Sequence, residues 1–136
     1  MKRKTDFRTE LSMYDVWKVK LKRIKLDILA VETEMEGVKA INSEGVKVST
    51  NPQTKINRFY DLSSKLEELE HERNRLESNI NYVHKKLLKI KDKTIRQAAI
   101  DMYVSNIGVR ELAIKYAWSK SELFRKIGRE IEKLSN

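Results

Sequence analysis

Apolar residues recur along the first ninety positions at alternating spacings of three and four, the pattern of a helix that buries one narrow stripe. The first stripe runs from Phe7 to Val38 and predicts a helix over about residues 6–41. The second runs from Ile56 to Ile90 and predicts a helix over about residues 55–91. Arg73 is its one polar member, and we interpret it as a register-setting interruption rather than a ligand site.

Residues 42–54 gather turn-forming residues and the single proline, so they predict a loop. Thr54 is then a reasonable N-cap for the second helix. Neither helix can bury its stripe alone, and a loop of this length lets the two fold back as an antiparallel hairpin. That pairing places residues 7–25 beside residues 75–91. Whether it forms within one chain or between chains is left open by the pattern.

The apolar spacing changes after residue 91 and predicts three shorter helices. Thr94 and Gln97 match a capping box that opens a helix through about Val104. A short helix is expected over Val109–Tyr116. A second capping box at Ser119–Glu122 opens a final helix to about Leu134, with its buried stripe at Leu123, Ile127, Ile131 and Leu134. The expected fold is all-α: a coiled-coil-like helical hairpin over residues 1–91, then a three-helix bundle over residues 92–136.

Composition supports long exposed helices, because 36% of the residues are charged and there are only four glycines and one proline. The absence of cysteine excludes a disulfide scaffold and thiolate metal sites, and it fits a reducing compartment. The sequence has no apolar run near the roughly 20 residues that a membrane span needs. We therefore expect a cytoplasmic protein without a membrane partner.

The net charge of +9 is concentrated at the two ends of the sequence. Residues 1–25 carry nine Lys/Arg against three Asp/Glu, and residues 85–136 carry thirteen against six. The middle of the chain is near neutral or acidic. Such a distribution favours a polyanionic partner, although solvated lysine-rich helix faces are a common alternative.

A short helix, a tight turn and a longer helix form the plan of a helix-turn-helix, which places the start of its second helix in the major groove of DNA. Arg125 is the best candidate for reading bases, because guanidinium pairs bidentately with guanine. The expected base-reading residues are Ser119, Lys120, Ser121, Phe124 and Arg125. The expected phosphate contacts are Arg110, Lys115, Lys126, Arg129 and Lys133.

Several of these side chains also have structural interpretations. Trp118 is expected to be a plug in the three-helix core rather than a nucleic-acid wedge, because it follows the apolar stripe. Glu122 fits the capping-box partner of Ser119 better than an acceptor for cytosine. Phe124 is balanced between a thymine methyl contact and packing at the core's edge. Gly128 costs its helix roughly 1 kcal/mol against Ala, which suggests a close helix crossing.

Residues 95–134 resemble a sigma-factor region-four helix-turn-helix, through Ile-Arg-Gln-Ala-Ala-Ile-Asp-Met-Tyr and Glu-Leu-Ala-Ile-Lys-Tyr-Ala-Trp-Ser-Lys-Ser-Glu-Leu-Phe-Arg-Lys-Ile. With its helical first half, the chain resembles the ArpU/RinA-type phage regulators of late-gene transcription. The resemblance implies a phage or prophage origin, a bacterial host cytoplasm and binding near promoters or packaging genes. One departure is Ala117, where the turn usually has glycine. It requires another turn geometry or strain at a positive φ.

Catalysis is not expected. His71 and His84 are thirteen residues apart on one predicted helix, about 220° around it, and the sequence has no phosphate loop or nucleophile elbow. We therefore expect no enzyme, cofactor, metal or catalytic residue.

The main hypothesis is a sequence-specific regulator of phage transcription that binds double-stranded DNA as a homodimer or higher homo-oligomer, or together with host RNA polymerase. One alternative is a small terminase subunit in DNA packaging, for which a closed ring of many subunits would be the sign. Another is a helical protein-interaction adaptor, for which failure to shift any duplex at about 50 mM salt would be the sign.

Overall fold

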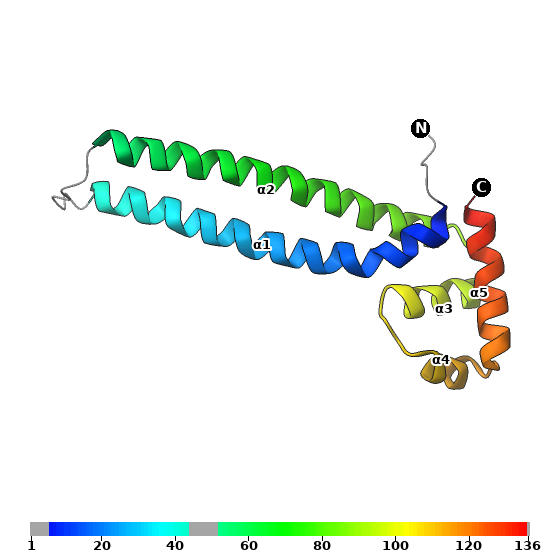
Figure 1. The fold of residues 1–136 in the computed structure, drawn as a ribbon. Helices are drawn as coiled ribbons and strands as arrows, with labels where there is room; N and C mark the ends of the chain where they lie inside the picture. Colours follow the sequence, from blue (N-terminus) through cyan, green and yellow to red (C-terminus); the bar gives the residue numbers. More distant parts are fainter. Residues whose placement is uncertain (1–5, 44–51, 136) are drawn as a thin grey trace. The chain divides into compact units, whose positions relative to one another are not determined.

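The computed structural model describes residues 6–43 and 52–135, and every regular element in them is an α-helix (Figure 1). The all-α fold class is thus confirmed. Residues 44–51 of the predicted loop lie outside the described residues. The five helices are α1 (Phe7–Ser43), α2 (Pro52–Leu87), α3 (Lys93–Tyr103), α4 (Val109–Tyr116) and α5 (Lys120–Leu134).

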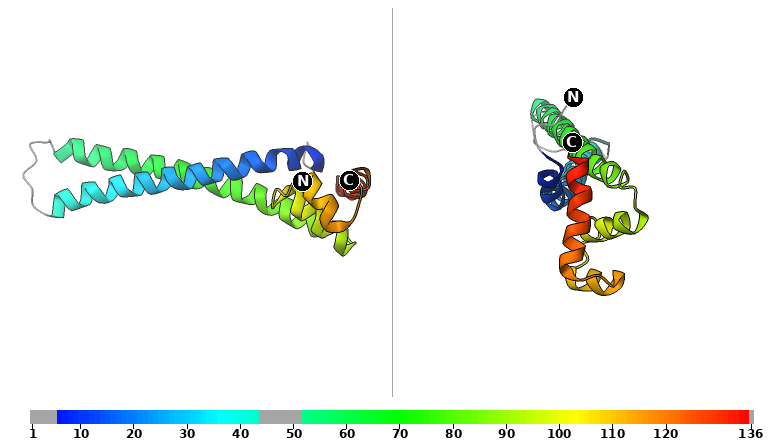
Figure 2. Two further views of the ribbon diagram at one scale, coloured as in Figure 1. Left: turned by 90° about the horizontal axis from the view of Figure 1, so that it is seen from below. Right: turned by 90° about the vertical axis from the view of Figure 1, so that its right-hand side faces the viewer.

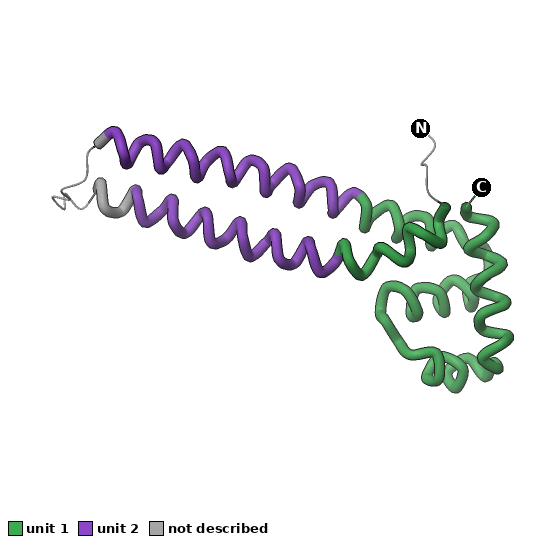
Figure 3. Tube along the Cα trace, in the orientation of Figure 1, with its two compact units in different colours: residues 1–17, 79–136 green, residues 18–78 purple. Residues whose placement is uncertain are grey.

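The chain forms two compact units, which are coloured separately in Figure 3. Unit 2 contains residues 18–78, and unit 1 contains residues 1–17 together with residues 79–136. The limits of both units fall inside α1 and α2. The predicted domain boundary after residue 91 stays a prediction.

Unit 2 consists of the second part of α1 and the first part of α2, side by side and antiparallel (Figures 1 and 2). Two ion pairs fix the direction: Lys25 lies 3.9 Å from Glu77, and Glu34 lies 3.5 Å from Arg58. Higher numbers on α1 thus meet lower numbers on α2, and the pairing forms within one chain. Each pair is largely exposed and contributes little to stability.

The apolar stripes form the seam of unit 2, as predicted. Ile28, Val31 and Leu76 are buried, and the remaining stripe positions from Leu21 to Val38 and from Phe59 to Arg73 are half-buried. Ile56 is the exception, because 47% of its surface is exposed. The prediction that it starts the second stripe is therefore wrong.

In unit 1, the beginning of α1 packs against the end of α2. Phe7 meets Tyr82 edge to face at 6.4 Å between ring centroids, and the Tyr14 hydroxyl hydrogen-bonds to His84 Nε2 at 2.7 Å. Around these contacts lie fully buried aliphatic residues, among them Val83 and Leu87. Residues 7–17 thus lie beside the last turns of α2, as the predicted hairpin requires.

The ends of α2 differ from prediction. It begins at Pro52, so Thr54 lies inside the helix and is not its N-cap. Proline is favoured in the first turn because it has no N–H to leave unpaired. At the other end α2 stops at Leu87 rather than near residue 91, and a turn follows in which the Lys89 and Ile90 N–H groups donate to the Lys86 and Leu87 carbonyls.

Helices α3, α4 and α5 pack pairwise around a small apolar core. Asp92 opens α3, its carboxylate accepting from the N–H groups of Thr94 and Ile95 at 2.9 and 3.0 Å. The predicted cap at Thr94 is therefore wrong by two residues. The core side chains, each at most 1% exposed, are Ala98, Ala99, Leu112, Leu123, Ile127 and Ile131.

Among the helices in the part of the chain that the structure describes, none has a stretch long and apolar enough to cross a membrane.

Candidate nucleic-acid interface

Helix α5 has one buried face and one exposed cationic face. Leu123, Ile127 and Ile131 anchor the buried face in the core of the small bundle. All five predicted base-reading residues are exposed: Ser119, Lys120, Ser121, Phe124 and Arg125. Phe124 is 55% exposed, so it does not pack in the core. The opening turns of α5 are therefore accessible to a ligand.

The start of α5 is fixed by its N-cap. Ser119 has an extended backbone, and its hydroxyl accepts from the Glu122 N–H at 3.1 Å. This confirms that Ser119 caps the helix. Such a cap is worth about 1 kcal/mol, and it sets the direction in which the first turn points.

The turn before α5 depends on a left-handed alanine. Ala117 has φ 55° and ψ 39°, and the Trp118 N–H donates to the Ala113 carbonyl at 3.0 Å. This bonding ends α4 in the manner of a glycine-terminated helix. Of the two outcomes predicted for Ala117, the structure has the positive φ.

Tyr116 and Trp118 stack beside this turn, with ring centroids 5.3 Å apart and planes at 23°. The Lys126 Nζ lies 4.5 Å from the centroid of the Trp118 ring, a cation–π distance. Trp118 is only half-buried, so the prediction of a core plug is wrong. The centre of the core is filled by Leu112 and Leu123 instead.

A buried carboxylate joins α3 to α4. Asp101 is 4% exposed, and it accepts hydrogen bonds from Tyr116 Oη at 2.6 Å, Lys115 Nζ at 2.8 Å and Gln97 Nε2 at 3.0 Å. Its backbone carbonyl accepts from Ile107 N–H at 2.9 Å. Asp101 of α3 thus connects α3 to α4 and to the loop between these two helices.

These contacts explain the titration of the group. Burial raises the pKa of Asp101, but the donors Lys115, Tyr116 and Gln97 outweigh it, so its pKa lies below the ordinary 3.8. The hydrogen bond to Asp101 raises the pKa of Lys115. Burial, followed by the bond to Asp101, raises the pKa of Tyr116. At neutral pH the carboxylate and ammonium are both charged and the phenol is neutral.

Sequence reasoning missed Asp101. The available signal was its position three residues after Ala98, within the apolar stripe of its helix. An acidic residue there must be paired or displaced.

The five predicted phosphate residues differ in their surroundings. Arg110 and Arg129 are exposed, and Lys133 is exposed but lies 3.1 Å from Glu130 Oε1. Lys126 is half-buried over Trp118, and the Lys115 ammonium is held by Asp101. The geometry therefore favours Arg110, Arg129 and Lys133 as contacts and gives Lys115 a structural role. The phosphate assignments themselves stay predictions.

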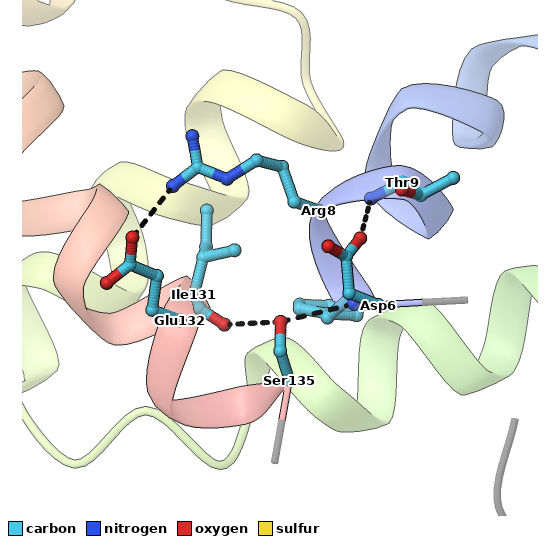
Figure 4. A network of polar contacts seen from close by, with 7 residues as sticks. Asp6, Arg8, Thr9, Ile131, Glu132 and Ser135 are labelled. Carbon is cyan, nitrogen blue, oxygen red and sulfur yellow. Dashed lines mark hydrogen bonds and ion pairs between the residues drawn. The ribbon is translucent and has the colours of Figure 1, made fainter. Parts of the chain in front are cut away.

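The beginning of α1 adds a cation beside α5 (Figure 4). Arg8 Nη2 lies 3.8 Å from Glu132 Oε1, with 63% of the arginine side chain exposed. The Phe7 N–H donates to Ser135 Oγ at 3.2 Å, and that hydroxyl donates to the Ile131 carbonyl at 3.2 Å. Arg8 was not among the predicted site residues, because only the fold brings it to α5.

Gly128 also lies on this side of α5. Among the atoms of the described residues, a Cβ added there would meet only Arg8 Nη2, at 3.6 Å, which is an ordinary van der Waals distance. The prediction that a close helix crossing requires Gly128 is therefore wrong.

Within the described part of the chain, no cluster of three or more His, Cys, Asp or Glu side chains could hold a metal ion. Comparison with protein-family models, with curated proteins and with solved structures finds no match for this chain. The resemblance to ArpU/RinA-type regulators therefore rests on the quoted residues and stays a prediction.

Proposed function

We propose that the chain is a sequence-specific double-stranded DNA-binding protein that regulates transcription, with α5 as its recognition helix. One observation carries the proposal. The opening turns of α5 expose Lys120, Ser121 and Arg125, while the opposite face of the same helix is anchored in the core. A recognition helix needs this combination, because its N-terminal residues must reach base edges.

The chemistry of the exposed face fits a duplex groove. Arg125 has five donors in a planar fork that matches the N7 and O6 acceptors of guanine. Phe124 adds an exposed apolar surface that suits a thymine methyl group. Arg129 and Lys133 follow along α5, where cations suit the phosphate backbone.

The support behind α5 favours readout with little rearrangement. The Ser119 cap, the left-handed Ala117 and the hydrogen bonds of Asp101 fix the turn that leads into the helix. Side chains held on a rigid element bind with a smaller loss of conformational entropy. Regulation by this protein, and a phage or prophage origin, follow from the resemblance stated above and belong to the same proposal.

The test begins with selection of bound sites from random duplex DNA. We expect Arg125→Ala to weaken binding to the selected site by about 1–3 kcal/mol, roughly 5- to 150-fold, with little change on random duplex. Lys133→Ala should weaken both duplexes alike, because a phosphate contact carries no sequence information. Fluorescence anisotropy at one fixed salt concentration measures both variants.

Lys65→Ala is the matched control, because Lys65 is an exposed lysine on α2 in unit 2. It should leave both affinities unchanged. Equal losses on the two duplexes for Arg125→Ala would refute the base-reading role. No binding to any duplex at about 50 mM salt would refute the proposed function as a whole.

A further inference from the structure

Helix α1 carries an apolar stripe in unit 2 that none of the residues described by the structure covers. Val19, Leu26 and Leu29 are 69%, 62% and 61% exposed. They are spaced by seven and three residues, the spacing of a helix seam. They lie on the outer side of α1, because Ile28 and Val31 occupy the buried side.

The charges around this stripe divide sharply along the helix. From residue 18 to residue 25 there are five Lys/Arg and no acid, and from residue 27 to residue 36 there are four Asp/Glu and no base. Lys18 and Lys22 lie in the first stretch, Glu32 and Glu36 lie in the second, and all four are exposed. The boundary between the two stretches falls in the middle of the apolar stripe.

We propose that a second copy of this chain docks on the stripe, with the two α1 helices antiparallel and a two-fold axis near Asp27. In that arrangement residue i of one chain lies opposite residue 54 − i of the other. Lys22 then faces Glu32 of the second copy, and Lys18 faces its Glu36. Leu26 and Leu29 of both copies meet around the axis.

The charge pattern selects this occupant and this direction. A two-fold interface must be self-complementary, since the same surface patch appears on both sides of it. An antiparallel pair matches the basic stretch of each copy with the acidic stretch of the other. A parallel pair would set basic against basic and acidic against acidic, which costs energy. The proposal rests on unit 2 alone and does not depend on DNA binding.

The first test is the mass of the full chain in solution, measured by sedimentation equilibrium against the 16.1 kDa of one chain. We expect the wild type to have twice that mass at micromolar concentration. Leu26→Lys/Leu29→Lys should have the single-chain mass and an unchanged helical circular dichroism spectrum. Tyr60→Lys is the matched control, because Tyr60 is an exposed apolar residue of α2 (66%), and it should stay dimeric. A monomeric wild type, or a dimer lost only in Tyr60→Lys, would overturn the proposal.

The second test uses the absence of native cysteine to determine direction. Near the axis, Leu26→Cys should form a disulfide with its copy under mild oxidation. In the antiparallel arrangement Val19 and its copy are offset by 16 residues, about 24 Å along the helix, which is beyond the reach of a disulfide. Val19→Cys should therefore stay unlinked. Cross-linking of both variants would show a parallel pair, and cross-linking of neither would place the interface elsewhere; either result refutes the proposal.

Discussion

At the scale of single residues, Asp101 is the polar group on which the small bundle depends most. Its carboxylate is almost fully buried and has three side-chain donors, one of them the ammonium of Lys115. A buried charge is tolerated only with such pairing. The turn that precedes α5 is therefore held partly by electrostatics, not only by apolar contacts.

We predict that Asp101→Asn lowers the free energy of unfolding by about 2–3 kcal/mol at pH 7, because the amide loses hydrogen bonds to a buried charge. The pKa of Asp101 is lowered by folding, so its contribution is present above the ordinary value of 3.8 and is lost as the pH falls through the lower folded value. The difference between variant and wild type should shrink below pH 4. Urea unfolding at several pH values measures it.

The exposed Asp61 of α2 gives the control. Asp61→Asn should change the free energy of unfolding by no more than about 0.5 kcal/mol at any of these pH values. A constant difference between Asp101→Asn and wild type from pH 7 to pH 2 would show that Asp101 acts through packing alone.

The contacts of Asp101 with its partners could not be predicted from the sequence. Lys115 and Tyr116 are 14 and 15 residues away and reach Asp101 only because the chain reverses between α3 and α4. No local spacing rule contains such a contact. The exposure of Arg125 and Ser121, by contrast, followed from the apolar stripe of their own helix and was predictable.

At the scale of elements, the helices followed from apolar periodicity but their ends did not. A stripe repeats many times and averages out local exceptions, so α1, α2 and α5 were found from it. An end depends on one or two capping groups. Asp92 rather than Thr94 caps α3, since its carboxylate accepts from the Thr94 and Ile95 N–H groups, and α2 ends four residues before the predicted position.

At two positions in this bundle, the local backbone conformation favours a different residue from the one present. Ala117 is left-handed, which costs an L-residue about 1–2 kcal/mol, and Gly128 is inside a helix, where alanine is better by about 1 kcal/mol. We predict that Ala117→Gly and Gly128→Ala each raise the free energy of unfolding by about 1 kcal/mol. Thermal and urea unfolding of the two variants and their combination provide the measurement.

Ala113→Gly is the control for Ala117→Gly, because it makes the same alanine-to-glycine change at an ordinary helical position. Ala113 lies inside α4 without a left-handed backbone, so Ala113→Gly should lower the free energy of unfolding by about 1 kcal/mol. If Ala117→Gly were destabilising by a similar amount, the left-handed turn would not exist in solution. If Gly128→Ala were destabilising, a contact closer than that with Arg8 would be present.

At the scale of the whole molecule, the two proposals divide the chain's charge between two tasks. In these proposals the exposed cations Arg110, Arg129 and Lys133 bind a polyanion, whereas the basic stretch and the acidic stretch of α1 bind a second copy. The net charge of +9 alone indicates neither the proposed DNA surface nor the proposed contact between chains. The positions of the charges along the helices distinguish the two surfaces.

This division predicts how DNA binding depends on salt. The logarithm of affinity falls with the logarithm of salt concentration by about 0.9 for each neutralised phosphate. With Arg110, Arg129 and Lys133 as contacts, one bound chain should give a slope of about −2.7 and a bound dimer about −5.4. Leu26→Lys/Leu29→Lys should therefore halve the wild-type slope, and Lys133→Ala should reduce it by about a third. Equal slopes for the wild type and the Leu26/Leu29 variant would show that the stripe on α1 does not deliver two chains to one duplex, even if each chain binds DNA.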